Sequence, residues 1–206
     1  FKYRNEMFES MNFEIDDAGN PYYIITYKEP TIGWFGGWDT TGLIVVNAVN
    51  GEMEKYSVDE APDWIDHIQS ANLAWYQIDN WGYYVNGWFN TLFGQKDMIQ
   101  TTDGFNYVSI GDEIYIFSGL TSVGSDRSIV GFALINLSNK AATYINVGGA
   151  DEYSAMNSAV GHVQHLNYTS TFPILLNIDG LPTYFMALTD YEGLVKLYAM
   201  VSVQDY

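Results

Sequence analysis

Apolar and polar residues alternate along much of the chain in short runs, and turn-forming residues separate these runs, which is typical of β-hairpins. The run GLIVVN at 42–47 leads into Asn50-Gly51, a strong hairpin signal, and GFALIN at 131–136 leads into Ser138-Asn139-Lys140. Three further polar turns lie between β-prone arms, at 15–23, 110–117 and 178–185. The pattern therefore predicts five hairpins.

Three segments carry apolar residues at helical spacing. From Asp59, acidic residues and a proline occupy an opening turn, and one apolar face follows, made by Ala61, Trp64, Ile65 and Ile68. A second helix is predicted over 151–165, with an acidic first turn, histidines near its end, and a face made by Tyr153, Met156, Val160 and Val163. A third is predicted over 75–94, although each of its two interior glycines weakens a helix by ~1 kcal/mol relative to Ala.

Strands that arrive as hairpins pair antiparallel, and helices that follow runs of strands tend to cover one sheet face. We therefore predict an α+β fold, in which antiparallel β-hairpins pack against amphipathic helices. The order hairpin, hairpin, helix occurs across 12–70 and again across 105–166, and a partial third copy spans 173–206. Residues 1–206 are thus expected to form one domain by imperfect duplication, with Gly-rich surface loops at 33–42 and 119–128.

The 206 residues have a formal net charge of −17, because 8 Lys and Arg stand against 25 Asp and Glu. Such a field repels phosphate backbones, so we expect no nucleic-acid partner. The lack of cysteine excludes a disulfide framework, a thiolate zinc site and a Cys nucleophile. The uncharged stretch 153–178 contains several polar residues and is interpreted as core rather than as a membrane span. The first residues do not resemble a signal peptide, so any targeting segment is expected outside this chain.

Residues that could support catalysis or bind a metal have simpler structural explanations. His162 and His165 are three apart on a predicted helix, but no third ligand is near, and a helix end explains them better. Acidic pairs occur in turns or first helical turns, where they stabilise the backbone, at Asp16-Asp17, Asp59-Glu60, Asp112-Glu113 and Asp151-Glu152. Nucleotide-binding and serine-hydrolase motifs are absent. We therefore expect no catalytic residues, no metal and no other cofactor.

Aromatic residues make up 17% of the chain, and the tryptophans are the notable excess. Exposed tryptophans can stack on sugar rings or lie at a bilayer interface, whereas buried ones are core. Trp34, Phe35 and Trp38 are the best candidates for exposure, because glycines surround them in a predicted loop. We predict that these three residues form a binding site for a protein or peptide.

A strand that ends in the pattern N-x-x-N-G, made by Asn47, Asn50 and Gly51, is followed by Glu52 and by a Tyr on the next strand. This arrangement resembles the small PepSY-type module. The corresponding turn of that module commonly reads D-x-x-T-G-E. In this chain Asn47, Asn50, Gly51 and Glu52 stand at the Asp, Thr, Gly and Glu positions, and Ser138-Asn139-Lys140 differs from the pattern more. The phrases FEIDDAGNPYYI at 13–24, DEYSAMNSA at 151–159 and PTYFMAL at 182–188 resemble the extracytoplasmic part of uncharacterised membrane proteins of Gram-positive bacteria. This resemblance implies a place outside the cytoplasmic membrane, with a membrane anchor in a segment absent from this chain.

These observations together predict a non-catalytic interaction or sensing module of the bacterial cell envelope, which binds a protein or peptide. One alternative is binding of cell-wall glycan through the same aromatic side chains. A carboxylate-dependent hydrolase is a further alternative, and it requires two acidic groups in one cleft.

Overall fold

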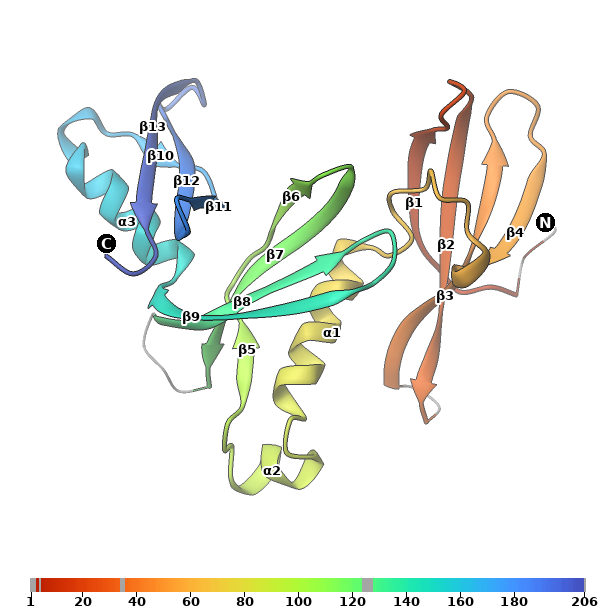
Figure 1. The fold of residues 1–206 in the computed structure, drawn as a ribbon, viewed down its shortest axis with the longest axis horizontal. Helices are drawn as coiled ribbons and strands as arrows, with labels where there is room; N and C mark the ends of the chain where they lie inside the picture. Colours follow the sequence, from red (N-terminus) through yellow and green to blue (C-terminus); the bar gives the residue numbers. More distant parts are fainter. Residues whose placement is uncertain (1–2, 4, 34–35, 124–127, 206) are drawn as a thin grey trace. The chain divides into compact units, whose positions relative to one another are not determined.

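The computed structural model describes residue 3 and residues 5–33, 36–123 and 128–205. Strands take up 49% of the described residues and helices 18%, and the strands form three antiparallel sheets (Figure 1). The predicted α+β class is therefore wrong, and the protein is predominantly β. Its internal contacts divide it into two compact units: unit 1 comprises Phe1–Asn80, Ser109–Tyr115 and Ile135–Ala142, and unit 2 comprises Trp81–Val108, Ile116–Leu134 and Thr143–Tyr206.

The first sheet is an antiparallel meander in unit 1, in the order β1-β2-β3-β4. Its strands are β1 (Phe8–Ile15), β2 (Pro21–Ile32), β3 (Gly36–Asn47) and β4 (Met53–Ser57). The predicted hairpins at 15–23 and 42–58 are confirmed as β1–β2 and β3–β4. One face of the sheet places Ile24, Leu43 and Val45 against Ile65 and Ile68 of the following segment, and this face forms the core of unit 1.

The helix predicted from Asp59 is wrong, because only a single 3-10 turn forms there, η1 (Val58–Glu60). Backbone N–H groups beyond this turn donate hydrogen bonds to residues outside the segment, instead of to helical carbonyls. The carboxylate of Glu14 accepts hydrogen bonds from the N–H groups of Asp66 and His67, and the carbonyl of Leu137 accepts from Ile68 and Gln69. Burial of the apolar side chains against the sheet thus outweighs helical periodicity in this segment.

The second sheet has the order β5-β7-β8-β9, with β6 also paired to β7. The strands are β5 (Ile99–Thr101), β6 (Asn106–Ile110), β7 (Glu113–Ser122), β8 (Ser128–Asn136) and β9 (Ala142–Ala150). The hairpins predicted at 110–117 and 131–147 are confirmed as β6–β7 and β8–β9. The predicted loop at 33–42 is largely wrong, because β3 begins at Gly36 and pairs with β2. In the predicted loop at 119–128, β7 extends to Ser122 and β8 begins at Ser128, and residues 124–127 lie outside the described residues.

The third sheet and its helix lie in unit 2. Strand β12 (Leu181–Thr189) pairs with β13 (Val195–Ser202), and also with β10 (Thr169–Ser170) and β11 (Ile174–Ile178), which confirms the hairpin predicted at 178–185. The helix predicted over 151–165 is confirmed as α3 (Glu152–His162), followed by the 3-10 turn η2 (Gln164–Leu166). In the core of this unit, the third sheet and α3 pack against β7 and β8. The buried residues of this core include Phe117, Phe132, Ala155, Tyr184 and Val203.

The helix predicted over 75–94 is present as two helices, α1 (Ala71–Tyr83) and α2 (Trp88–Phe93). The break between them ends at Gly87, whose φ of +81° a helix cannot contain. The predicted duplication stays a prediction: paired hairpins occur in both proposed copies, and a helix directly follows only the second.

Candidate binding site

Of the three predicted binding residues, Trp34 and Phe35 lie outside the described residues, and Trp38 lies on β3. Trp38 is half-buried, and the ammonium group of Lys28 lies 5.6 Å from the centroid of its ring. The backbone carbonyl of Trp38 accepts a hydrogen bond of 2.9 Å from Nε2 of Gln77 on α1. Trp38 is therefore built into the contact between β3 and α1, rather than projecting from a loop.

A small pocket opens beside Trp38, with a volume of about 330 Å³. Its lining combines two aromatic rings, an ion pair and an amide: Glu9, Lys28, Trp38, Asn72, Leu73 and Tyr76. Lys28 and Glu9 form the ion pair across β1 and β2, and Glu9 also accepts a hydrogen bond of 2.8 Å from the Ser70 hydroxyl. Aromatic faces beside polar hydrogen-bonding groups suit a sugar ring or a peptide side chain.

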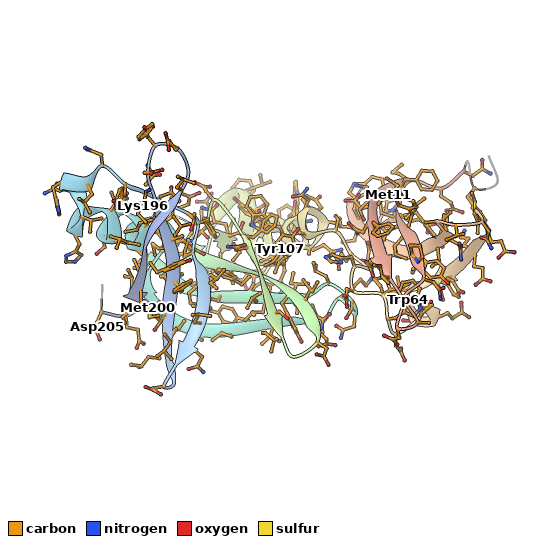
Figure 2. All side chains as sticks on the ribbon, turned by 90° about the horizontal axis from the view of Figure 1, so that it is seen from above. Met11, Trp64, Tyr107, Lys196, Met200 and Asp205 are labelled. Carbon is orange, nitrogen blue, oxygen red and sulfur yellow. The ribbon has the colours of Figure 1, made fainter. Side chains whose placement is uncertain are left out.

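Unit 1 exposes several large apolar side chains on the outer face of the first sheet, the face opposite Ile65 and Ile68. The strand register places its side chains in two cross-strand rows, Met11–Ile25–Ile44–Lys55 and Phe13–Tyr23–Val46–Met53. Figure 2 shows Met11 and Trp64 on opposite sides of this sheet. Exposure is greatest along β1, with 65% of Met11, 54% of Phe13 and 59% of Ile15 accessible, whereas Ile44 in the first row is buried. An antiparallel sheet with one solvated face normally carries polar residues there.

The outer face ends at charged turns and at an open edge. Asp16 and Asp17 lie in the β1–β2 turn, and Glu52 lies in the β3–β4 turn at the same end of the sheet. Hydrogen bonds from the side chain and backbone of Asn20 hold the pKa of Asp16 below its ordinary value, so this carboxylate stays charged. Strand β1 is the first strand in the sheet order, which leaves its outer edge without a strand partner in the described sheet.

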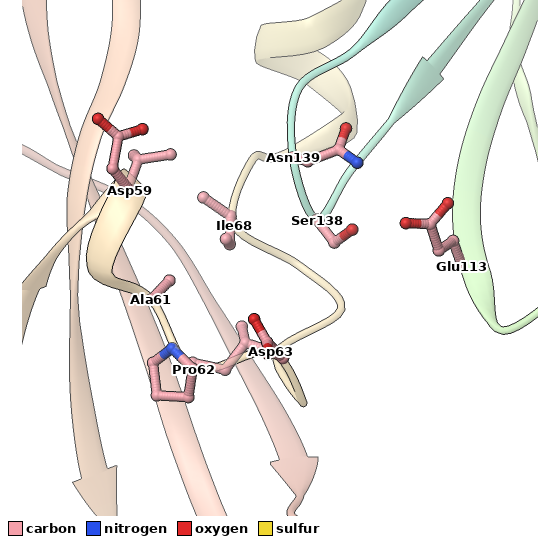
Figure 3. A pocket seen from close by; sticks show the side chains of 10 residues that line it. Asp59, Ala61, Pro62, Asp63, Ile68, Glu113, Ser138 and Asn139 are labelled. Carbon is pink, nitrogen blue, oxygen red and sulfur yellow. The ribbon is translucent and has the colours of Figure 1, made fainter.

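A second, acidic pocket of about 450 Å³ lies beside the segment after β4 (Figure 3). It brings together Asp59 and Asp63 on one side and Glu113, Ser138 and Asn139 on the other. Figure 3 shows the carboxylates of Asp63 and Glu113 directed into the space between the two sides. None of its lining residues, all within the described part of the chain, is basic. The pocket therefore offers negative charge to a cationic group.

In unit 2, Glu152 is a completely buried acidic residue at the first position of α3. Its Oε1 accepts a hydrogen bond of 2.7 Å from the N–H of Gly119 on β7. Burial raises the pKa of Glu152, and hydrogen bonds from its own N–H and from Gly119 oppose this rise. The preceding Asp151 caps the helix by accepting a 2.6 Å hydrogen bond from the N–H of Ser154.

The predicted histidine pair is separated by the end of a helix, since His162 closes α3 and His165 lies in η2. Within the described ranges, His, Asp and Glu side chains do not form a group of three or more that could hold a metal ion. His67 instead pairs with Glu14, whose Oε1 lies 3.3 Å from its Nδ1. Across residues 5–33, 36–123 and 128–205, no helix has the length and apolarity needed to cross a membrane.

No family model, curated protein or solved structure matches this chain. Function must therefore be argued from the geometry of its own residues.

Sequence reasoning missed the outer face, although its signal is visible in the run FESMNFEI of β1. Met11, Phe13 and Ile15 alternate with polar residues there, which indicates a strand with one apolar face. The pattern could not show that this apolar face is the uncovered one, because Ile24 and Leu43 direct the covering segment to the opposite side. Tyr76 and Asn72 of the Trp38 pocket gave no signal, because they meet Trp38 only in the folded chain.

Proposed function

We propose that this chain is a non-catalytic binding module that holds an apolar segment of a protein or peptide on the outer face of its first sheet. The observation that carries the proposal is the group of exposed apolar side chains on that face, Met11, Phe13, Ile15, Tyr23 and Met53, with Phe13 and Tyr23 in edge-to-face contact at a centroid distance of 5.5 Å. Contiguous exposed apolar surface rimmed by polar residues is typical of interaction sites. The open edge of β1 can add main-chain hydrogen bonds to an extended partner.

The charge of the chain specifies the chemistry of the partner. A net charge of −17 and the carboxylates of the two adjacent turns favour a segment with Lys or Arg flanking its apolar residues. The same charge disfavours an acidic partner, whose approach would be repelled. We therefore infer that the bound segment is apolar at its centre and basic at its ends.

A peptide display library presented to the 206-residue chain tests this function. We expect the enriched peptides to combine aromatic or β-branched residues with Lys or Arg, and to bind less tightly as the salt concentration rises. The double substitution F13S/Y23S removes the centre of the face and should weaken binding of the selected peptides by tenfold or more. Val49→Ser changes a residue that is 79% exposed in the neighbouring turn and is the matched control. Enrichment of acidic peptides, or equal binding by the double variant, would contradict the proposal.

We further propose that the module works outside the cytoplasmic membrane, attached through a segment absent from this chain. The resemblance of 13–24, 151–159 and 182–188 to extracytoplasmic domains supports this place, as does the PepSY-like turn at 47–52. Protease treatment of intact cells should cleave the domain in the full-length protein. Protection until the cells are lysed would place the domain inside and contradict this part of the proposal.

The Trp38 pocket favours a second candidate function, binding of cell-wall glycan. Its rings from Trp38 and Tyr76 lie beside the amide of Asn72 and the ion pair of Lys28 and Glu9, a combination that suits a sugar. Soluble peptidoglycan fragments should then bind saturably, and Tyr76→Ala should weaken that binding while Tyr191→Ala, at a residue 92% exposed, leaves it unchanged. Binding of these fragments that survives Tyr76→Ala would exclude this pocket as the glycan site.

A further inference from the structure

The end of α1 and the whole of α2 form an aromatic tip, defined here as Trp81–Phe93. Figure 1 shows α2 as the short helix that connects the end of α1 to β5. The most exposed side chains of this tip are Phe93, at 84%, and Phe89, at 73%. Its other large apolar side chains are about half exposed: Trp81, Tyr84, Val85, Trp88 and Leu92. Such a concentration of exposed aromatic side chains requires something to cover it.

The aromatic tip is also free of charge in a strongly acidic chain. Residues 80–95 contain no Asp, Glu, Lys, Arg or His, whereas 16% of the whole chain is charged. Apart from its aromatic and aliphatic residues, this range contains only neutral residues: asparagines, glycines, one threonine and one glutamine. A surface of this composition loses no ion hydration when it leaves water.

The polar groups of the tip are satisfied from within. The side-chain amide of Asn90 donates to the carbonyl of Lys96 and accepts from the N–H of Lys96, at 2.9 and 3.0 Å. Asn86 donates to the same carbonyl at 2.9 Å, and the backbone carbonyl of Asn90 accepts from the N–H groups of Gly94 and Gln95. The side-chain amides of Asn86 and Asn90 are therefore bonded to the backbone of the same segment, while the aromatic rings are exposed. Internal satisfaction of this kind is what a backbone needs where water is scarce.

The tip is held firmly on unit 2. The hydroxyl of Tyr83 donates a 2.7 Å hydrogen bond to Oε1 of Gln100 on β5. Gly82 packs so closely on the same strand that an added Cβ would lie 2.2 Å from the carbonyl oxygen of Ile99. These contacts present the rings in a defined direction, which lowers the entropy lost when they are buried.

We propose that the aromatic tip inserts into the headgroup and acyl boundary of a phospholipid bilayer. Trp and Tyr are the side chains enriched at this interface, and Phe and Leu reach the adjacent hydrocarbon. The charge distribution selects the lipid: an uncharged tip on a chain of net charge −17 suits zwitterionic rather than anionic lipid. The same charge opposes a second copy of the chain as the occupant, because its tip would bring another −17 with it.

Co-sedimentation of the 206-residue chain with phosphatidylcholine vesicles tests the insertion. We expect binding that changes little with salt concentration, and weaker binding when phosphatidylglycerol is added at low ionic strength. The double substitution F89S/F93S should lower the partition coefficient roughly 100-fold, because each large apolar side chain contributes about tenfold. The matched control is Y191S/Y198S, which removes two exposed aromatic side chains of unit 2 outside the tip.

Quenching by brominated lipids gives a second readout that does not depend on the amount bound. Emission from Trp88 should be quenched on vesicle binding, and Trp88→Phe should remove most of that quenching while the chain still binds. Absence of binding to phosphatidylcholine, or equal binding by F89S/F93S, would overturn the proposal. Self-association in analytical ultracentrifugation that F89S/F93S abolishes would assign the tip to a second copy and overturn it as well.

Discussion

The carboxylate of Glu152 lies directly against the backbone of Gly119, whose N–H donates to its Oε1 at 2.7 Å. A Cβ added at Gly119 would lie 2.8 Å from both carboxylate oxygens and 3.0 Å from Cγ2 of Ile129. A helix start on α3 and a strand, β7, therefore meet at a point where only glycine fits. The contact joins an acidic side chain to the core made by Phe117, Phe132 and Tyr184.

Gly119→Ala should destabilise unit 2 by roughly 1–3 kcal/mol, because the fully buried Glu152 side chain has no space into which it can turn. Gly161→Ala is the matched control, since an added Cβ there meets nothing within 4 Å and α3 gains helix propensity of about 0.5–1 kcal/mol. Urea denaturation of both variants measures the difference. Equal stability of the two variants would show that the Glu152 contact adapts to the added methyl group.

Glu152→Gln should increase stability relative to the native chain as the pH rises above the ordinary carboxyl range. Burial raises the pKa of Glu152 in the folded state, so the folded protein holds this proton more tightly than the unfolded chain. The free energy of unfolding that Glu152 contributes therefore falls as pH rises from the ordinary pKa through the raised one. The amide keeps the acceptor for Gly119 and cannot ionise.

The measurement is the free energy of unfolding of both proteins between pH 4 and 8. Asp190→Asn gives a contrast of opposite sign, because the hydrogen bond from Lys196 lowers the pKa of Asp190 and its contribution is lost as pH falls. Parallel curves for the native chain and Glu152→Gln would contradict the assigned role of burial.

Asp39 and Lys140 should be coupled by about 1 kcal/mol in a double-mutant cycle of Asp39→Ala and Lys140→Met. Both carboxylate oxygens of Asp39 lie 2.8 Å from Nζ of Lys140, which also donates to the carbonyl of Thr40. The pair joins residues about 100 positions apart and is partly shielded from water. We expect the coupling to decrease with added salt and to exceed that of Lys196 with Asp190, which closes a local turn. A coupling near zero would mean that the pair has no net effect on unit 1.

Trp38→Ala should lower the stability of unit 1 by about 1–2 kcal/mol, because part of its ring and its contact with Lys28 are lost. This differs from the expectation for an exposed loop residue, whose removal would leave stability unchanged. Trp38→Phe should recover most of the loss. Thermal denaturation of the two variants decides between the interpretations. An unchanged midpoint for Trp38→Ala would show that the ring of Trp38 does not contribute to the packing of unit 1.

Several elements could be predicted from local patterns alone, and others could not. The Asn47–Glu52 turn can be predicted from the sequence, because Asn47 Oδ1 accepts hydrogen bonds from the N–H groups of Val49 and Asn50 within the turn itself. Helix α3 can be predicted in the same way, because its cap, Asp151, lies only three residues before Ser154, from whose N–H it accepts a hydrogen bond. The segment after Asp59 was misjudged because its N–H groups bond to Glu14 and Leu137, which are distant in sequence.

The candidate surfaces divide in the same way. The aromatic excess and the net charge of −17 are properties of composition, and they limit the partners of any surface of this chain. Which aromatic residues face outward is decided by packing, so that Trp38 joins α1 while Phe89 and Phe93 remain exposed. The helical spacing of residues 75–94 predicts a helix but does not show which of its aromatic side chains are covered.

By itself, the sequence determined the hairpins, the capped helix α3, the acidic charge and the absence of cysteine chemistry, because turn formation, capping and charge depend on residues close together or on composition. The tertiary structure alone decided the predominantly β class, the uncovered face of the first sheet, the burial of Glu152 and the exposure of the aromatic tip. Each of these depends on which distant segment covers which surface. Burial of apolar area is non-directional, and many pairings of the same strands and helices satisfy the local pattern equally well.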